Sequence, residues 1–209
     1  MDAERGTYAE IVERRIKTEC VDFIFPEVTR IIPMGNQETV DAINTAIEEL
    51  VSVLIPDNIS DVNGCSVTVT GRSEVTVNQN AVLSIRIEVF SFPFMAANGS
   101  TTLKALTFNL NTAEQVMFYQ LFKRNTDYRI VIDQIIREQV EKRNIPAIGD
   151  IPRVTDNQEY YLTEDSLVVF FQELVFTPHV VGPPEFPIPY QLLANMIRKD
   201  GPIGLILNK

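Results

Sequence analysis

The apolar run Leu167–Phe171 places the strongest constraint on how this chain folds. A strand with one solvated face alternates apolar and polar side chains, and this run does not alternate. Glu164-Asp165-Ser166 precede it and predict a tight turn, because short polar side chains bond their own backbone. Glu159–Thr163 predict the partner strand. The stretch therefore predicts a β-hairpin whose second strand is covered on both faces.

Two segments with apolar residues at helical spacing can cover such a sheet, one at 37–54 behind the N-cap Asn36 and one at 126–143. Their core-facing positions are Val40, Ile43, Ile47, Leu50, Val51 and Leu54, and Tyr128, Val131, Ile132, Ile135, Ile136 and Val140. Asn44 lies at the edge of the first stripe. We expect its amide to tie the helix to a neighbouring loop, since buried amides are normally paired; a ligand contact is the alternative.

Apolar and β-branched runs predict further strands at Val12–Phe25, Cys65–Val77, Ala81–Phe94 and Thr101–Leu110. Pro26 is expected to end the first strand, because proline cannot donate to a ladder. Gln191–Arg198 predict a short helix, and Gly204–Leu207 predict a final strand or a tail.

Each half of the chain then contains a helix followed by a hairpin. This order predicts an α+β fold with antiparallel sheets and two main helices packed on them. We divide the chain into an N-terminal half, 1–100, and a C-terminal half, 101–209, which together form one compact unit.

The charge balance is acidic, with 18 Lys and Arg against 28 Asp and Glu, a net charge of −10. The basic groups Arg14-Arg15 and Lys142-Arg143 are interleaved with glutamates. We therefore expect no nucleic-acid partner, since that would require a basic patch. A basic partner suits this charge better.

Residues that carry chemistry are scarce. Cys20 and Cys65 lie in strand-like runs without metal-ligand spacing, which favours two buried free thiols over a disulfide. The only histidine is His179, and no nucleophile motif surrounds any serine. The sequence therefore predicts no catalytic residue, no metal site and no cofactor.

No window of 18 apolar residues is present, so we expect no membrane span. Residues 1–5 are charged and lack an apolar core, which does not fit a signal peptide. The sequence as written predicts a cytoplasmic protein, or one whose targeting segment lies outside it.

The hairpin stretch also carries a family pattern, made of Tyr161–Phe171, Pro178, Gly182-Pro183 and Ile188-Pro189-Tyr190. This pattern resembles the C-terminal domain of unknown function in the anti-sigma factor RsiV and the peptidoglycan deacetylase PdaC. Leu121-Phe122-Lys123 fit the segment before its helix. The N-terminal half, with Phe25-Pro26 and Ile43-Asn44, is similar to the companion domain that precedes it in PdaC.

The resemblance implies a non-catalytic, envelope-facing module that binds or senses a protein or a cell-wall component. In the anti-sigma factor such a module binds lysozyme, a basic protein. Candidate binding residues are His179, Tyr190 and Asn98, although a structural role is favoured for His179 and Tyr190. The family commonly has an Ala-His segment where this chain has Ala96-Ala97-Asn98-Gly99. Two alternatives remain open: an enzyme that acts on glycans, and an intracellular scaffold that self-associates through a sheet edge.

Overall fold

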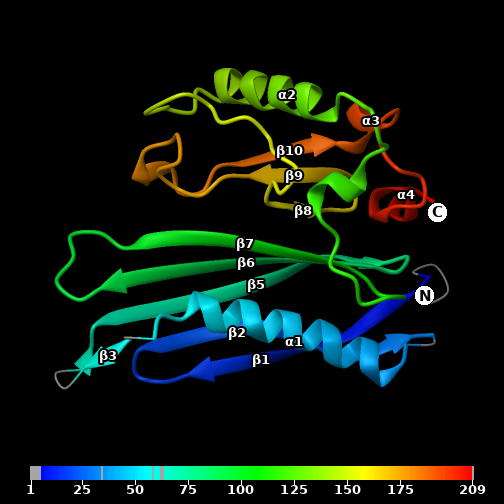
Figure 1. The fold of residues 1–209 in the computed structure, drawn as a ribbon. Helices are drawn as coiled ribbons and strands as arrows, with labels where there is room; N and C mark the ends of the chain where they lie inside the picture. The colour runs from blue at the N-terminus through cyan, green and yellow to red at the C-terminus, as the bar shows by residue number, and fades with distance from the viewer. Residues whose placement is uncertain (1–5, 34, 58, 62–63, 209) are drawn as a thin grey trace.

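The computed structural model describes residues 6–33, 35–57, 59–61 and 64–208, and these form four stacked layers (Figure 1). The layers are helix α1, a five-stranded sheet, a three-stranded sheet and helix α2. Antiparallel pairs dominate both sheets, so the predicted α+β fold is confirmed. No helix among the described residues is long and apolar enough to cross a membrane.

The first sheet has the order β1-β2-β5-β6-β7. Its strands are β1 (Tyr8–Lys17), β2 (Val21–Ile32), β5 (Val67–Gln79), β6 (Val82–Pro93) and β7 (Ser100–Asn109), and β3 (Ser60–Asp61) and β4 (Gly64–Cys65) form a separate short pair. Helix α1 (Gln37–Leu54) begins as predicted, because Asn36 Oδ1 accepts from the Thr39 N–H at 2.7 Å. Its buried stripe closes a core with this sheet.

The second sheet has the order β10-β9-β8, from β8 (Tyr160–Leu162), β9 (Ser166–Phe170) and β10 (Glu185–Pro189). Helix α2 (Tyr128–Lys142) covers its outer face (Figure 1). Strand β9 lies in the centre and all its residues are buried, which confirms the strand predicted to be covered on both faces. The division of the chain into halves at residue 100 stays a prediction.

The remaining elements are short: η2 (Phe118–Leu121), η3 (His179–Val181), α3 (Tyr190–Leu193) and α4 (Pro202–Leu207). The strand or tail predicted at Gly204–Leu207 was wrong, because this segment is the end of helix α4. Pro202 favours a helix start, since its missing N–H has no partner in a first turn. Ile203 and Ile206 then enter the core of the second layer.

The single strand predicted over Val12–Phe25 was also wrong. The chain turns at residues 18–20, and β1 and β2 form a hairpin. Thr18 makes the turn, because its Oγ1 accepts from the N–H groups of Cys20 and Val21 at 3.2 and 3.0 Å. Strand β2 also continues past Pro26 to Ile32.

Strand β2 can continue through Pro26 because β2 and β5 have separated before this residue. β2 pairs with β5 in parallel only through Val21–Phe23 and Val69–Gly71, and then leaves it. Asn44 of α1 bonds the freed backbone of Val28: Oδ1 accepts from its N–H and Nδ2 donates to its carbonyl, both at 2.8 Å. Pro26 faces the same unpaired side by alternation, so its missing donor breaks no ladder bond. The expected tie by Asn44 is confirmed, although its partner is a strand and not a loop.

A second asparagine joins the β1–β2 hairpin to β5 at the other end of the gap between β2 and β5. Asn78 of β5 bonds the backbone of Ala9 in the same two-way manner, with both distances 2.8 Å. The Ala81 N–H donates to the Thr7 carbonyl nearby at 2.7 Å. The β1–β2 hairpin therefore contacts β5 through β2 at one end and through β1 at the other.

The two cysteines form a disulfide, Cys20–Cys65, so the prediction of free thiols was wrong. The unpredicted turn at residues 18–20 brings Cys20 to the end of the molecule where β4 lies, with a Cα–Cα distance of 5.5 Å. The bond closes a loop of 45 residues, which stabilises the fold by about 4 kcal/mol in the chain-entropy view.

Replacing Asn44 by Ala tests the closure of the split sheet. The substitution leaves the buried N–H and carbonyl of Val28 without partners, so we expect a loss of about 2 to 4 kcal/mol in the free energy of unfolding. Urea denaturation measures this loss. The exposed neighbour Thr45→Ala is the control and should cost less than about 1 kcal/mol. Equal small losses in both variants would contradict the role given to Asn44.

Candidate functional site

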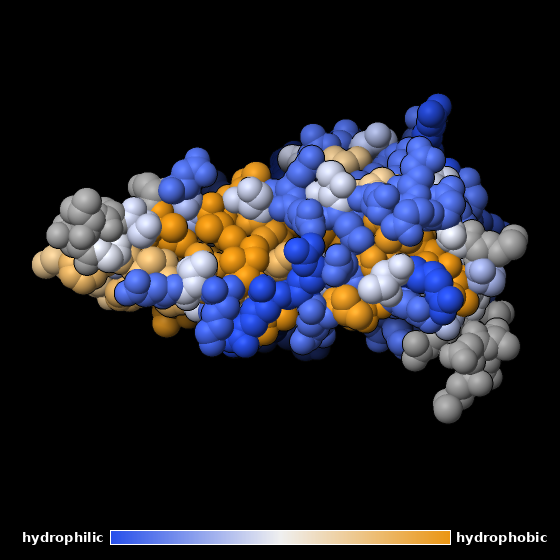
Figure 2. Space-filling model, turned by 90° about the horizontal axis from the view of Figure 1, so that it is seen from below, coloured by the Kyte–Doolittle hydropathy of each residue, from blue (hydrophilic) through white to orange (hydrophobic). Residues whose placement is uncertain are grey.

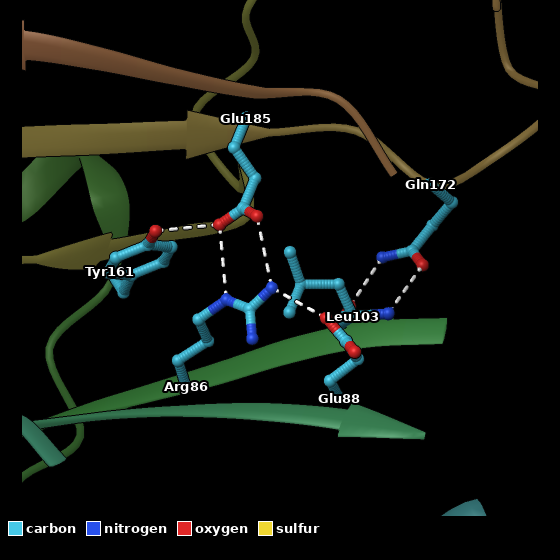
Figure 3. A network of polar contacts seen from close by, with 6 residues as sticks. All are labelled: Arg86, Glu88, Leu103, Tyr161, Gln172 and Glu185. Atoms are coloured by element: carbon cyan, nitrogen blue, oxygen red, sulfur yellow. Dashed lines mark hydrogen bonds and ion pairs between the residues drawn. The ribbon is translucent and has the colours of Figure 1, made fainter. Parts of the chain in front are cut away.

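A network of charged side chains crosses the seam between the two sheets (Figure 3). Arg86 of β6 donates from Nε and Nη2 to the two carboxylate oxygens of Glu185 on β10, at 3.1 and 3.0 Å. Its Nη2 also donates to Glu88 at 2.7 Å. Such a two-pronged contact fixes orientation as well as charge. Arg86 thus holds β10 over the first sheet.

Tyr161 of β8 completes this network, and its hydroxyl donates to Glu185 Oε2 at 2.6 Å. Burial raises the pKa of Tyr161 well above its usual range, and the hydrogen bond to Glu185 adds to this rise. Two carboxylates, Glu88 and Glu185, meet here, but both bind the guanidinium of Arg86. Both carboxylates of this network are therefore held as ion-pair partners of one arginine.

Further polar contacts join the layers along the same seam. The Gln172 side chain bonds both backbone groups of Leu103 on β7, at 2.6 and 3.1 Å (Figure 3). The Leu162 N–H donates to Ser84 Oγ at 3.0 Å. Because these groups satisfy backbone atoms that the strands leave unpaired, we assign the seam a structural role.

The candidate residues named from the sequence lie on different elements. Tyr190 is buried at the start of α3, and its hydroxyl donates to the Thr163 carbonyl at 2.7 Å. His179 in η3 is half-exposed, with its Nδ1 3.3 Å from the Glu173 carboxylate. Asn98 is exposed in the loop between β6 and β7. Hydrogen bonds among the described residues join none of the three to another, so they form no common site.

A groove on the α1 side of the first sheet was not predicted. It has a volume of about 420 Å³ and lies between the C-terminal half of α1 and the β1–β2 hairpin. Its lining residues are Arg14, Ile16, Phe25, Glu48, Val51, Ser52, Ile55, Pro56 and Asp57. Figure 2 looks onto this side of the molecule and shows apolar side chains gathered toward the end where β3 lies.

The groove combines an apolar floor with charged walls. Phe25 and Val51 form buried parts of the lining, and Ile16 and Ile55 are half-buried. The Arg14 guanidinium lies 5.7 Å from the centre of the Phe25 ring and binds the Glu48 carboxylate. Asp57 adds a second carboxylate to the wall. Sequence patterns did not indicate this groove, because the β1–β2 hairpin that forms one side of it was interpreted as one strand.

The described part of the chain has no evident metal-binding site. No group of three or more His, Cys, Asp and Glu side chains is placed there to hold an ion.

Comparison with known proteins finds a family similarity in the second layer. Residues 119–191 match the family model DUF3298, a protein family of unknown function. This DUF3298 segment runs from η2 through α2, β8, β9 and β10 to the start of α3. It contains the hairpin and the Ile188-Pro189-Tyr190 corner that the sequence singled out. No curated protein sequence matches the chain.

Two solved structures share the whole fold. A DUF3298 family member from Bacteroides fragilis superposes with a TM-score of 0.62 at 16% identity and covers 97% of each chain. A DUF3298 family protein from Pseudomonas aeruginosa has a TM-score of 0.62 at 9% identity and covers 92% of this chain and 94% of its own. At these identities the likeness is one of fold. The likeness extends over both layers of this chain, since the comparisons cover 97% and 92% of it.

The buried tyrosines predict how stability falls at alkaline pH. Burial, with the Asp156 bond, raises the pKa of Tyr128 to about 12, and burial also raises the pKa values of Tyr160, Tyr161 and Tyr190. Unfolded tyrosine loses its proton near pH 10. Above that pH the unfolded chain releases protons that the folded chain keeps, so stability is complete below about pH 10 and falls as pH rises.

Urea unfolding between about pH 9 and 12 measures this fall. The variant Tyr160→Phe should flatten its slope by about 1.4 kcal/mol per pH unit. An unchanged slope in that variant would contradict a raised pKa for Tyr160.

Proposed function

We propose that this chain is a non-catalytic binding module that recognises a basic protein. The observation that carries the proposal is the one-sided charge of α1. Gln37–Leu54 contain the acidic residues Glu38, Asp41, Glu48 and Glu49 and no basic residue. All four side chains are exposed, and Glu48 lines the groove with its partly apolar floor. An acidic face next to a groove that can take apolar side chains suits a basic partner.

The opposite face has a different charge balance. Helix α2 carries three acidic residues, Asp133, Glu138 and Glu141, and three basic ones, Arg129, Arg137 and Lys142. The net charge of −10 is therefore not spread evenly over the two helices. Complementary charge raises the rate of encounter and selects partners, so the α1 side is the face that would attract a cation.

Two further features support this proposal. The charged groups of the seam bind one another, which leaves Glu88 and Glu185 as structural partners of Arg86 and not as free acid and base. The disulfide Cys20–Cys65 is typical of proteins in oxidising compartments. That compartment fits the resemblance to envelope-facing modules, and lysozyme, a basic protein of the same environment, is the partner we propose.

Retention of lysozyme on the immobilised protein tests this function. We expect retention at low salt that weakens as the salt concentration rises, because screening reduces the attraction between exposed charges. An acidic protein of similar size should pass through. The double variant Asp41→Lys/Glu49→Lys should lose most of the retention.

The control for that variant makes the same change of charge on the other side, with Glu138→Lys/Glu141→Lys in α2. It should keep the retention of the unchanged protein. Absence of retention at low salt, or an equal loss in both variants, would count against a basic partner at the α1 face.

A further inference from the structure

Strand β1 is an outer strand whose backbone is open over most of its length. Among the described strands it pairs with β2 alone. Among the described residues, hydrogen bonds from outside this pair reach its backbone only near its start, where Asn78 bonds Ala9. The backbone of 11–17 therefore keeps unpaired N–H and C=O groups along its outer side.

The other outer strands of the two large sheets have backbone groups bound by side chains or replaced by proline, as the Leu162 N–H of β8 is bound by Ser84. On β10, Gln139 and Arg143 donate to the carbonyls of Pro187 and Glu185, both at 2.8 Å, and Pro187 and Pro189 have no N–H to offer. On β7, the Gln172 side chain bonds both backbone groups of Leu103. Among the described strands, β1 is the outer strand with a continuous stretch, 11–17, whose outer backbone receives no hydrogen bond from a side chain.

The open edge and the groove adjoin each other. Arg14 and Ile16 of β1 line the groove, and Val12 shares their side of the strand by alternation. The Val12 side chain is 46% exposed although it is apolar. A strand added beside β1 would direct every second side chain over this groove.

The charge around the edge selects the occupant. Glu13 and Glu19 are exposed on the hairpin, and Glu48 and Asp57 line the groove. Three basic residues also lie on β1: Arg14 binds Glu48 and lies 3.6 Å from Glu27, Arg15 binds Asp22, and Lys17 is exposed. The six carboxylates named for this edge thus outnumber its three cations. A basic segment therefore fits better than an acidic one.

We propose that β1 and the groove bind an extended basic segment of a partner protein, which adds to the sheet as a strand beside β1. A bulky apolar side chain of the segment fills the groove, and neighbouring Lys or Arg side chains meet Glu48 and Asp57. This inference rests on the proposed function and gives it a location.

A fluorescent peptide of alternating lysine and valine, with a central phenylalanine, serves as the probe, and anisotropy measures its binding. Ser52→Trp fills the groove, because Ser52 lines it. Val53→Trp is the matched control, since Val53 is the next residue of α1, is 82% exposed and is not part of the lining. We expect Ser52→Trp to weaken binding about tenfold or more, and Val53→Trp to change it by less than about twofold.

Strand addition has its own test. The same peptide with alternate backbone nitrogens methylated loses donors to the β1 edge, so it should bind about tenfold more weakly. Undiminished binding of the methylated peptide, or equal effects of the two tryptophan variants, would overturn the proposal.

Two further outcomes separate this site from the proposed function. If lysozyme is retained but the peptide does not bind, the site is wrong and the function stands. If neither binds, both are wrong. The groove could instead bind a second copy of the chain, and sedimentation at increasing protein concentration tests this. Self-association that Ser52→Trp abolishes would assign the groove to the second copy and overturn the proposal.

Discussion

The fold depends on two asparagine amides that replace the hydrogen bonds of a divided sheet. Where β2 leaves β5, Asn44 satisfies both backbone groups of Val28, and Asn78 does the same for Ala9. A buried N–H or carbonyl without a partner costs about 1 to 3 kcal/mol, so the split needs these amides. Asn44 also fixes α1 against β2. The helix therefore lies beside β1 without covering it, and the groove follows from this placement.

The two layers use their charges in different ways. At the seam, Arg86 binds Glu185 and Glu88, and Tyr161 completes the contact, so these polar groups hold the three-stranded sheet on the first sheet. On the α1 side, the acidic residues of the helix stay exposed beside an open strand edge. The network around Arg86 belongs to the architecture, and the acidic α1 face is the one we propose for recognition.

Sequence patterns predicted the elements whose signals are local. The stripes of α1 and α2, the Asn36 cap and the continuous apolar run of β9 each depend on neighbouring residues, and each was confirmed. The turn at residues 18–20 was missed because apolar residues continue on both sides of it. The disulfide and the groove were missed with it, since both depend on contacts between distant segments. The signal available was Thr18-Glu19-Cys20, a polar interruption in an apolar run.

Hydrogen exchange of the protein with and without the lysine–valine probe shows directly which layer recognises the partner. If β1 and the groove bind the probe, amide exchange becomes slower in β1 and in the last turns of α1 and stays unchanged in β8, β9 and β10. Slower exchange confined to β8, β9 and β10 would contradict this binding site, because the partner would then bind the layer whose charged groups we assign to structure.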